Sequence, residues 1–347
     1  MDIKKYFESA LEKNASDLHL VSGNKPALRI HGELNFISDQ DLAADELEAA
    51  IFSLMTKEDI DFFKKNKELD FALNIGGGNF RINLHRQEGQ IGLSARVVPD
   101  KIPGPKEVGV DETIYQLSHL NQGLILVTGP SGSGKSTTLA VLINLINKER
   151  RAHIITIEDP VEFIFQEEQS IIEQRELGRD TDSFSEALKR ALRQDPNVIM
   201  VGEMRDLETI SATLTAAETG HLVLSTLHTS TAAETIQRIV DIFPAHRQQQ
   251  ILSQLGSVLR AIICQQLLPK IGGGVIVARE ILINTPAVAN LIREAKIANL
   301  AQAIQTGRNE GMVTMQSALK QLYDQGLIEK QVLENRLGNY ETLSTYY

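Results

Sequence analysis

Residues 129–138 have the types and the spacing of a loop that binds the phosphates of a nucleotide. They read Gly-Pro-Ser-Gly-Ser-Gly-Lys-Ser-Thr-Thr and fit the pattern G-x-x-x-x-G-K-[S/T] without a mismatch. Glycines let backbone N–H groups curl around phosphate oxygens, and the start of a helix adds a favourable positive partial charge. The pattern predicts that Lys135 reaches the β- and γ-phosphates and that the Ser136 hydroxyl ligates Mg²⁺.

The segments on either side of this loop supply the context that the pattern needs. Residues 124–127 are a short apolar run typical of a buried strand, and residues 138–147 carry apolar side chains at helical spacing. This order favours a phosphate-binding loop over a glycine-rich turn that merely contains Gly-Lys-Ser. From the loop we expect these residues to bind the nucleotide: Gly129, Ser131, Gly132, Ser133, Gly134, Lys135, Ser136 and Thr137.

Three carboxylates follow the apolar run at residues 154–157. Glu158, Asp159 and Glu162 come directly after this expected strand. In an open parallel sheet, ligands bind outside the carboxyl ends of the strands. The three side chains are therefore candidates to hold Mg²⁺, which we assign to Glu158 and Asp159, or to position a water molecule, which we assign to Glu162. A solvated acidic turn explains the same residues equally well.

A second apolar run, residues 198–201, also leads to an acidic residue. Glu203 is expected near the nucleotide, where it could orient or deprotonate the attacking water. The alternative is that Glu203 and Asp206 only favour the start of a following helix. The phosphate-binding loop upstream favours the catalytic interpretation.

Histidine and arginine provide further candidates. The expected strand 222–225 has His221 before it and His228 after it, and His228 at the exit could sense the γ-phosphate. A histidine in such a place is more often a satisfied polar core residue. Arg81 and Arg96 lie 15 residues apart on segments that we expect to pair as strands, and from the sequence alone they are ordinary strand arginines.

The pattern along the chain divides it into four parts. Residues 1–98 mix short strands and helices and predict a small α/β domain. Residues 99–118 begin with three prolines and one glycine within 99–105, which predicts a stiff linker. In 119–275, strands alternate with helices, which is typical of a parallel sheet covered on both faces. Residues 276–347 predict a strand followed by helices.

Composition excludes several classes of protein. The chain has 347 residues, a net charge of −10 and a single cysteine, Cys264. One cysteine rules out a disulfide framework and a four-cysteine zinc site, and we expect Cys264 to be a buried small apolar residue. The acidic balance argues against a nucleic-acid partner. No apolar run approaches the ~20 residues of a membrane span, so we expect no membrane insertion, and the N-terminus does not fit a signal peptide.

Together these motifs resemble the type IV pilus retraction ATPases, the PilT-like branch of the GspE/PilT secretion ATPase superfamily. The resemblance extends over nearly the whole chain. Its motifs correspond to the N-terminal segment 15–20, the phosphate-binding loop 129–138, an aspartate box at 157–163, a Walker B region at 202–209, a histidine box at 219–229, and C-terminal signatures at 284–287, 290–294 and 303–307. The family's C-terminal signature usually has an arginine where this chain has Ala289.

The resemblance implies a PAS-like N-terminal domain and a RecA-like ATPase domain with a parallel sheet and a helical C-terminal extension. It implies a homohexameric motor that binds ATP and Mg²⁺ and drives pilus retraction and twitching motility. Arg81 and Arg96 would contact phosphates, Glu203 would act on water, and Glu162 and His228 would line the site. The implied partners are an inner-membrane platform protein at the pilus base and a paralogous ATPase. The resemblance implies a cytoplasmic location, with the motor held peripherally at the inner membrane by that platform.

Four other functions compete with this one. An accessory PilU-like paralogue shares all the motifs. An assembly or type II secretion ATPase usually has a four-cysteine zinc element, which a single cysteine cannot form. A non-motor ATP-binding regulator would tolerate the loss of Lys135 and Glu203, which this chain retains. A nucleic-acid translocase does not agree with the acidic composition.

Overall fold

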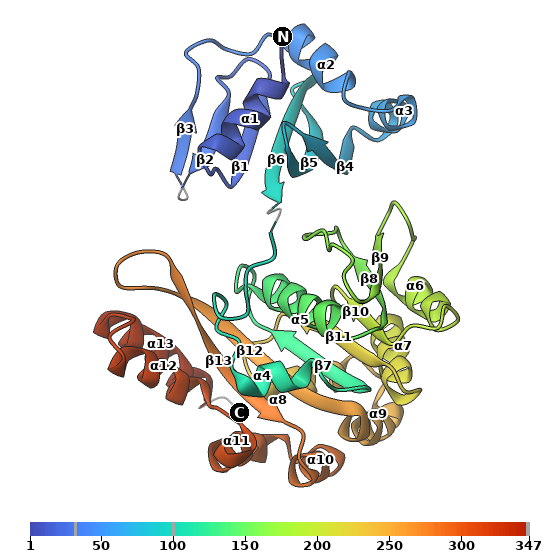
Figure 1. Ribbon diagram of the computed structural model, residues 1–347, viewed down its shortest axis with the longest axis vertical. Coiled ribbons are helices and arrows are strands. Elements are labelled where there is room, and N and C mark those ends of the chain that lie inside the picture. The colour runs from blue at the N-terminus through green and yellow to red at the C-terminus, as the bar shows by residue number, and fades with distance from the viewer. Residues whose placement is uncertain (31–32, 99–100, 345–347) are drawn as a thin grey trace. The chain divides into compact units, whose positions relative to one another are not determined.

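The computed structural model of the chain describes residues 1–30, 33–98 and 101–344. Residues 99 and 100 of the predicted linker and residues 345–347 of the predicted C-terminal region lie outside the described residues. The chain divides into two compact units, Met1–Lys101 and Ile102–Tyr347 (Figure 1). Each unit is described by itself.

Six strands form one antiparallel sheet in the first unit, in the spatial order β3-β2-β1-β6-β5-β4. Three helices accompany the sheet. The strands are β1 (Asp17–Val21), β2 (Ala27–Ile30), β3 (Glu33–Phe36), β4 (Glu68–Ile75), β5 (Gly78–Gln87) and β6 (Gln90–Val98), and the helices are α1 (Lys4–Glu12), α2 (Ala44–Phe52) and α3 (Lys57–Asn66).

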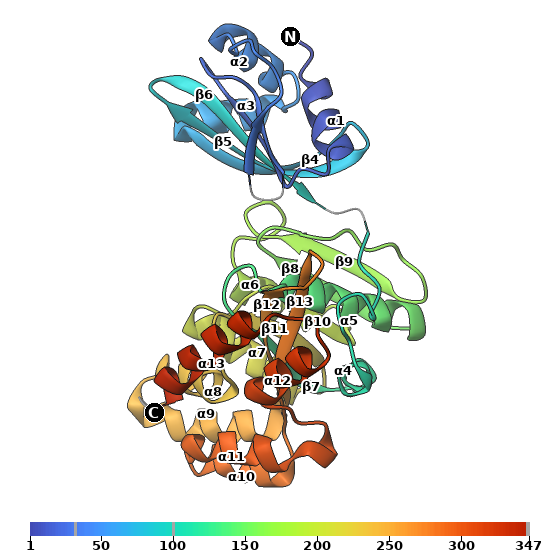
Figure 2. The same cartoon turned by 90° about the vertical axis from the view of Figure 1, so that its left-hand side faces the viewer.

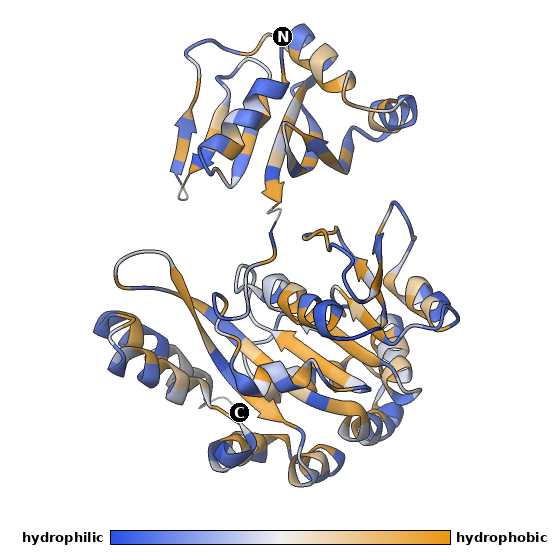
Figure 3. Cartoon of the chain, viewed as in Figure 1, coloured by the Kyte–Doolittle hydropathy of each residue, from blue (hydrophilic) through white to orange (hydrophobic). Residues whose placement is uncertain are grey.

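One face of this sheet is apolar and the other is polar. Phe80, Ile82 and Leu84 alternate along β5 and are buried together with Phe7 of α1 and Phe63 of α3. The helices therefore cover the apolar face, and Figure 3 shows the alternation of hydrophobic and hydrophilic residues along these strands. Residues between the buried positions of β5, including Arg81, lie on the opposite face.

The second unit contains a seven-stranded sheet in the order β13-β12-β7-β11-β10-β8-β9. Neighbouring strands are parallel throughout except at one edge, where β13 runs antiparallel to β12. The strands are β7 (Gly123–Thr128), β8 (His153–Glu158), β9 (Ile171–Glu176), β10 (Val198–Val201), β11 (Leu222–Leu227), β12 (Leu259–Pro269) and β13 (Val275–Ile283).

Helices cover both faces of this sheet. Helices α4 (Glu112–Leu117) and α5 (Lys135–Glu149) contribute to the core on one face, and α6 (Phe184–Ala191), α7 (Leu207–Glu218), α8 (Ala232–Asp241) and α9 (Ala245–Val258) to the core on the other. Because both faces are covered, every residue of β7, β10 and β11 is buried, and the centre of the sheet is largely hydrophobic in Figure 3. The predicted α/β class with a parallel sheet is confirmed.

The remaining helices form the predicted C-terminal extension. They are α10 (Pro286–Arg293), α11 (Leu300–Thr306), α12 (Met315–Asp324) and α13 (Lys330–Ser344), with short 3₁₀ turns η1 (Ile297–Asn299) and η2 (Arg308–Glu310). Helix α10 lies beside α9 and α11 (Figures 1 and 2). Within the described residues, no helix is both long and apolar enough to cross a membrane.

Ala289 lies in the contact between α10 and α9. Its side chain is only 6% exposed, and its carbonyl oxygen would lie 3.0 Å from a Cβ added at Gly256. The two helices therefore approach closely at this point, and the alanine found in place of the arginine that the resemblance expects packs between them.

Candidate functional site

The phosphate-binding loop joins the end of β7 to the start of α5. Gly129, Gly132 and Gly134 have φ values of +145°, +75° and +83°, which residues with a Cβ rarely adopt. A Cβ at Gly129 would also lie 2.3 Å from the carbonyl oxygen of Gln265. Glycine is therefore required at Gly129 both for its conformation and for the close approach of β12.

Several backbone donors of this loop are unpaired. Within the described part of the chain, the N–H groups of Gly132, Gly134, Lys135 and Ser136 have no hydrogen-bond acceptor. Buried or half-buried N–H groups normally find a partner, and here they lie at the N-terminus of a 15-residue helix. Such a set of donors fits the oxygens of a phosphate group.

Lys135 is folded back onto its own loop. Its Nζ donates to the carbonyl oxygens of Gly129 at 2.8 Å and Pro130 at 3.1 Å. Burial lowers the pKa of the Lys135 ammonium, while the charges of Glu162 and Glu203 act to raise it. The Lys135 ammonium therefore lies inside the loop, and its pKa is affected by the charges of Glu162 and Glu203, the two acidic residues predicted to act on water.

Glu203 and His228 meet because β10 and β11 are neighbours in the sheet. Glu203 Oε2 lies 3.5 Å from His228 Nε2, and Glu203 Oε1 lies 2.8 Å from Arg205 Nε. The turn that carries Glu203 is fixed to β11, since the Thr226 hydroxyl donates to the carbonyl oxygen of Gly202 at 2.6 Å. The structure thus brings together two of the three predicted catalytic residues. His221 lies at the other end of β11, where its Nδ1 contacts the carbonyl oxygen of Ala216.

Glu158 is buried at the end of β8. Its Oε1 accepts hydrogen bonds from the Thr156 hydroxyl at 2.6 Å and the Gln174 amide at 3.3 Å, and its Oε2 accepts from the Glu162 N–H at 3.4 Å. Burial raises the pKa of Glu158, and the hydrogen bonds oppose this effect. Glu162 and Asp159 are exposed on the loop that follows.

The loop that carries Glu162 is held by residues of β9 that the sequence analysis did not single out. Gln174 donates to the carbonyl oxygen of Phe163 at 2.8 Å and accepts from the N–H of Phe165 at 3.0 Å. Glu176 accepts from the N–H of Val161 at 3.1 Å. Gln174 and Glu176 are two residues apart on an edge strand, so they lie on the same face of it. That spacing is the sequence signal that could have identified them.

The hydroxyl residues of the loop differ in their surroundings. Ser131 is exposed, Ser136 and Thr137 are half-buried, and Ser133 is buried. Among the residues that the structure describes, the Ser136 and Thr137 hydroxyls have no hydrogen-bond partner. Ser136 therefore has both lone pairs available for a cation. No group of three or more His, Cys, Asp or Glu residues that could hold a metal is found among the described residues.

Arg81 and Arg96 lie directly opposite each other on β5 and β6 of the first unit. Arg96 Nε also contacts Asp17 Oδ1 at 3.0 Å, and the Arg96 side chain is 68% exposed. The expected pairing of the two segments is confirmed. Two like charges directly opposite on a sheet repel each other, and the Asp17 carboxylate beside Arg96 offsets this repulsion.

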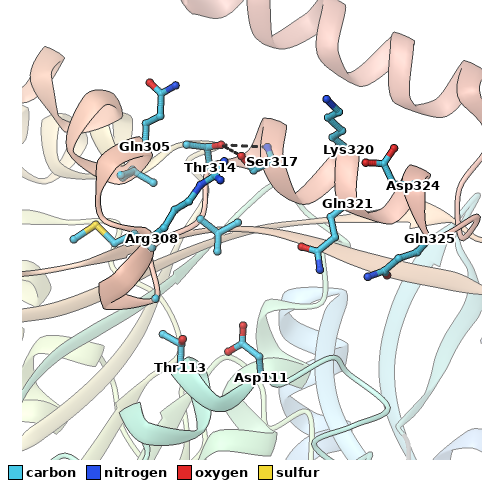
Figure 4. Close-up of a pocket in the computed structure, with 14 residues that line it drawn as sticks. Asp111, Thr113, Gln305, Arg308, Thr314, Ser317, Lys320, Gln321, Asp324 and Gln325 are labelled. Atoms are coloured by element: carbon cyan, nitrogen blue, oxygen red, sulfur yellow. Dashed lines mark hydrogen bonds between the residues drawn. The ribbon is translucent and has the colours of Figure 1, made fainter.

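A separate cavity of about 560 Å³ lies between the start of α4 and the C-terminal extension (Figure 4). Asp111 and Thr113 line it on one side, and Arg308, Lys320 and Asp324 are among the residues that line it on the other. None of the predicted site residues lines this cavity. It is therefore distinct from the phosphate-binding loop.

Comparisons with known proteins agree with the resemblance. A family model described as Type II/IV secretion system protein matches residues 1–338. The type IV pilus retraction ATPase PilT of Pseudomonas aeruginosa is 46% identical over 332 residues, which covers 95% of this chain and 96% of that protein. The type IV pilus ATPase PilU of the same organism is 38% identical over 330 residues, which covers 94% of this chain and 86% of that protein.

The fold also matches a solved structure along its length. The crystal structure of the pilus retraction motor PilT with bound ADP has a TM-score of 0.91 to this chain at 46% identity, with 96% of each chain covered. The match includes the RecA-like ATPase fold and the N-terminal domain. The predicted fold class and family resemblance are thereby confirmed.

Proposed function

The chain belongs to the Type II/IV secretion system protein family, and on this premise we propose that it is a motor ATPase that drives the retraction of type IV pili. The observation that carries the proposal is a phosphate-binding loop with unpaired N–H donors beside the contact between Glu203 and His228. The 46% identity to a pilus retraction ATPase over almost the whole length supports the biological role. The reaction is hydrolysis of ATP to ADP and phosphate, coupled to movement of the two units.

The nucleotide phosphates are bound by the loop and the first turn of α5. Backbone N–H groups surround the phosphate oxygens, and Lys135 exchanges the carbonyl oxygens of Gly129 and Pro130 for the β- and γ-phosphates. The same burial that lowers its pKa strengthens its attraction to an anion, because little water separates the charges. The residues of the loop in this role are Gly129, Ser131, Gly132, Ser133, Gly134, Lys135, Ser136 and Thr137.

Glu203 accepts a proton from the attacking water. Its carboxylate is held by Arg205 and His228, so its orientation is fixed before the substrate arrives. His228 follows β11 and precedes α8, and its contact with Glu203 would let it respond to the γ-phosphate. Glu162, whose charge acts on Lys135, lines the same site.

The proposed metal ion is Mg²⁺. The Ser136 hydroxyl, which has no hydrogen-bond partner among the described residues, would hold the ion, and Glu158, which accepts three hydrogen bonds, and Asp159 would add negative charge to the site. Mg²⁺, when bound, supplies positive charge to the β- and γ-phosphate oxygens. A site that depends on one hydroxyl and the nucleotide itself agrees with the preference of Mg²⁺ for few protein ligands.

Arg81 and Arg96 supply further positive charge to the transferring phosphate. Arginine in this role is worth ~10³–10⁵ in rate. The proposed assembly is a ring of six copies, in which the arginines serve their own subunit or a neighbour. ATP binding then favours one arrangement of the two units, and hydrolysis and product release return the other.

The proposed partner is an inner-membrane platform protein at the base of the pilus, with a paralogous ATPase as a second partner. In this account the chain works from the cytoplasm and is held at the membrane by that platform. No nucleic acid and no insertion into the bilayer are required. The net charge of −10 agrees with a protein partner rather than a nucleic acid.

The accessory PilU-like paralogue is the nearest alternative. The identity of 46% to PilT against 38% to PilU favours the retraction motor itself. An assembly or type II secretion ATPase is disfavoured because Cys264 is the chain's only cysteine. A non-motor regulator would show nucleotide binding without turnover.

The proposal is tested with the purified full-length chain in a phosphate-release assay with ATP and Mg²⁺. Sustained turnover that is lost in Lys135→Ala supports the ATPase. Binding without turnover supports the regulator. The pilus role is tested by surface twitching of cells that lack the gene, complemented with the wild-type chain or with Lys135→Ala. Motility restored equally by both would contradict the proposal.

A further inference from the structure

Arg279, on β13, is a buried cation without a carboxylate partner among the residues that the structure describes. Its side chain contacts neutral acceptors: NH1 donates to the carbonyl oxygen of Gly109 at 2.6 Å, and NH2 donates to that of Val108 at 2.7 Å. The residue is 7% exposed, and burial lowers its pKa to about 10 although the charge of Asp111 opposes this effect. A buried charge is costly unless it is paired and hydrogen-bonded, and here the Arg279 Nε has no hydrogen-bond partner among the described residues, so the neutral acceptors offset only part of this cost.

The same guanidinium begins a chain of hydrogen bonds that all run in one direction. Arg279 NH2 donates to the Thr138 hydroxyl at 3.3 Å, and this hydroxyl donates to Gln265 Oε1 at 3.0 Å. Gln265 Nε2 then donates to the carbonyl oxygen of Ser133 at 2.8 Å. Thr138 and Gln265 are each 1% exposed, so water does not compete with these bonds. Hydrogen bonds in such a chain polarise and strengthen one another.

The chain ends on the phosphate-binding loop. The carbonyl of Ser133 belongs to the same peptide unit as the N–H of Gly134, one of the unpaired donors. A hydrogen bond to this carbonyl makes that N–H a stronger donor to a phosphate oxygen. Gln265 also supports the loop directly, because its carbonyl oxygen occupies the space beside Gly129. A phosphate that binds the loop therefore acts on the Ser133–Gly134 peptide and on Gln265.

The other end of the chain holds the segment through which the polypeptide enters the second unit. Val108 and Gly109 lie a few residues after the unit boundary at Lys101 and Ile102. Gly109 has a φ of +66°, and a Cβ there would lie 3.3 Å from Arg279 NH1. A turn in which the Val110 N–H donates to the Pro105 carbonyl oxygen at 2.8 Å closes this segment. Ile102 and Val110 pack against the core at the two ends of this segment, and Arg279 fixes the backbone of Val108 and Gly109 between them.

We propose that Arg279, Thr138 and Gln265 are positioning residues that couple occupancy of the phosphate-binding loop to the segment 102–111 that enters the ATPase unit. The inference rests on the proposed nucleotide binding. Nucleotide phosphates orient the Ser133–Gly134 peptide, the hydrogen-bond chain tightens, and Arg279 holds Val108 and Gly109 more firmly. Because coupling is reciprocal, displacement of this segment weakens nucleotide binding by the same factor.

Hydrogen exchange of the full-length chain, with and without saturating ADP, tests the coupling. Within residues 106–111, the amides of residues 107–110 are hydrogen-bonded in the turn, so exchange in this stretch is measurable. ADP is expected to slow their exchange by about fivefold or more in the wild type. In Thr138→Val, which removes the central hydroxyl at nearly constant volume, ADP binds about fivefold more weakly. At saturation it no longer slows exchange at 106–111.

Arg150→Lys is the matched control. The Arg150 guanidinium also holds backbone carbonyl oxygens, those of Ser118 and Leu120, and no bond joins it to Thr138 or to the loop. This variant keeps the ADP-dependent slowing at 106–111. A general loss of stability would change exchange equally with and without ADP, so the difference caused by ADP reports the coupling.

Each outcome decides one claim. ADP that binds the wild type without slowing exchange at 106–111 refutes the coupling and leaves the proposed function intact. A wild-type chain that binds no ADP refutes the proposed function. Full slowing in Thr138→Val also overturns the coupling. Arg279→Lys serves as the second variant, since an ammonium cannot reach both carbonyl oxygens and Thr138 in one geometry, and it is expected to behave like Thr138→Val.

Discussion

Glu203→Gln separates chemistry from binding and folding more cleanly than other changes at this site. Glutamine keeps the shape of Glu203 but cannot take a proton from water. The ion pair with Arg205 is lost, yet Arg205 is 70% exposed, so this pair contributes at most about 1 kcal/mol to stability. For a chain of this size the melting temperature should fall by no more than about 2–4 °C.

The effect on turnover should be far larger. Loss of a general base lowers the rate by ~10²–10⁴-fold. Glu203→Gln should therefore lose at least ~10²-fold in kcat in a phosphate-release assay, while a fluorescent ADP analogue binds within about threefold of the wild type. Glu208→Gln is the matched control, because Glu208 is exposed in the first turn of α7, and it should turn over normally. A Glu203→Gln enzyme with kcat within threefold of the wild type would remove Glu203 from the catalytic role.

Three further predictions follow from the geometry. Gly129→Ala should abolish ADP binding, since its Cβ would lie 2.3 Å from a backbone oxygen. Gly132→Ala should weaken ADP binding by only about fivefold, because Gly132 has a φ of +75° but open space around an added Cβ. Equal losses of ADP affinity in a binding titration of the two variants would contradict this explanation. His228→Asn should lower kcat by about tenfold with little change in ADP affinity, because Glu203 loses its contact at 3.5 Å with the imidazole. An unchanged kcat in the phosphate-release assay would refute a role for this contact. Burial raises the pKa of Cys264 well above its usual value, so the thiol stays protonated in the folded state. The contribution of this thiol to the free energy of unfolding is therefore complete below the unfolded pKa of about 8.5 and falls by up to about 1.4 kcal/mol per pH unit above it. In urea unfolding, Cys264→Ala should lack this contribution to the fall in stability with pH. An identical pH dependence in the variant and the wild type would contradict the prediction.

Much of the site could be predicted because its parts are local in the sequence. The strand β7, the loop and the start of α5 are contiguous, and each glycine of the pattern has the positive φ that the pattern requires. The pairing of Arg81 with Arg96 also follows from a short hairpin-like connection between β5 and β6. The expectation that Cys264 is buried is confirmed, since the residue is fully enclosed.

The parts that were missed depend on strands without clear boundaries. β12 begins directly after α9 ends at Val258, with no turn residues between them, so its Gln265 was not recognised as the support of the loop. β9 is an edge strand whose residues 173–176 are all polar, and its Gln174 holds the Glu162 loop only through tertiary contacts. Such contacts arise from the order of strands in the sheet, which local periodicity does not contain.

Two smaller elements were missed for different reasons. Helix α4 lies within residues 99–118, where the prolines predicted only a linker, and its Ile114 and Leu117 are buried in the core. Strand β3 is short and exposed, with Leu34 49% and Phe36 65% accessible, so it lacks the burial pattern that marks a strand. Short elements carry too few residues to show a period.

The number of surface pili on cells whose only copy of the gene carries Glu203→Gln tests the central claim most directly. A motor that retracts pili, once unable to hydrolyse ATP, should leave cells with more pili by electron microscopy and without twitching motility. Cells without pili would contradict retraction and indicate an assembly role, and an unchanged number of pili with normal motility would contradict any motor role at the pilus.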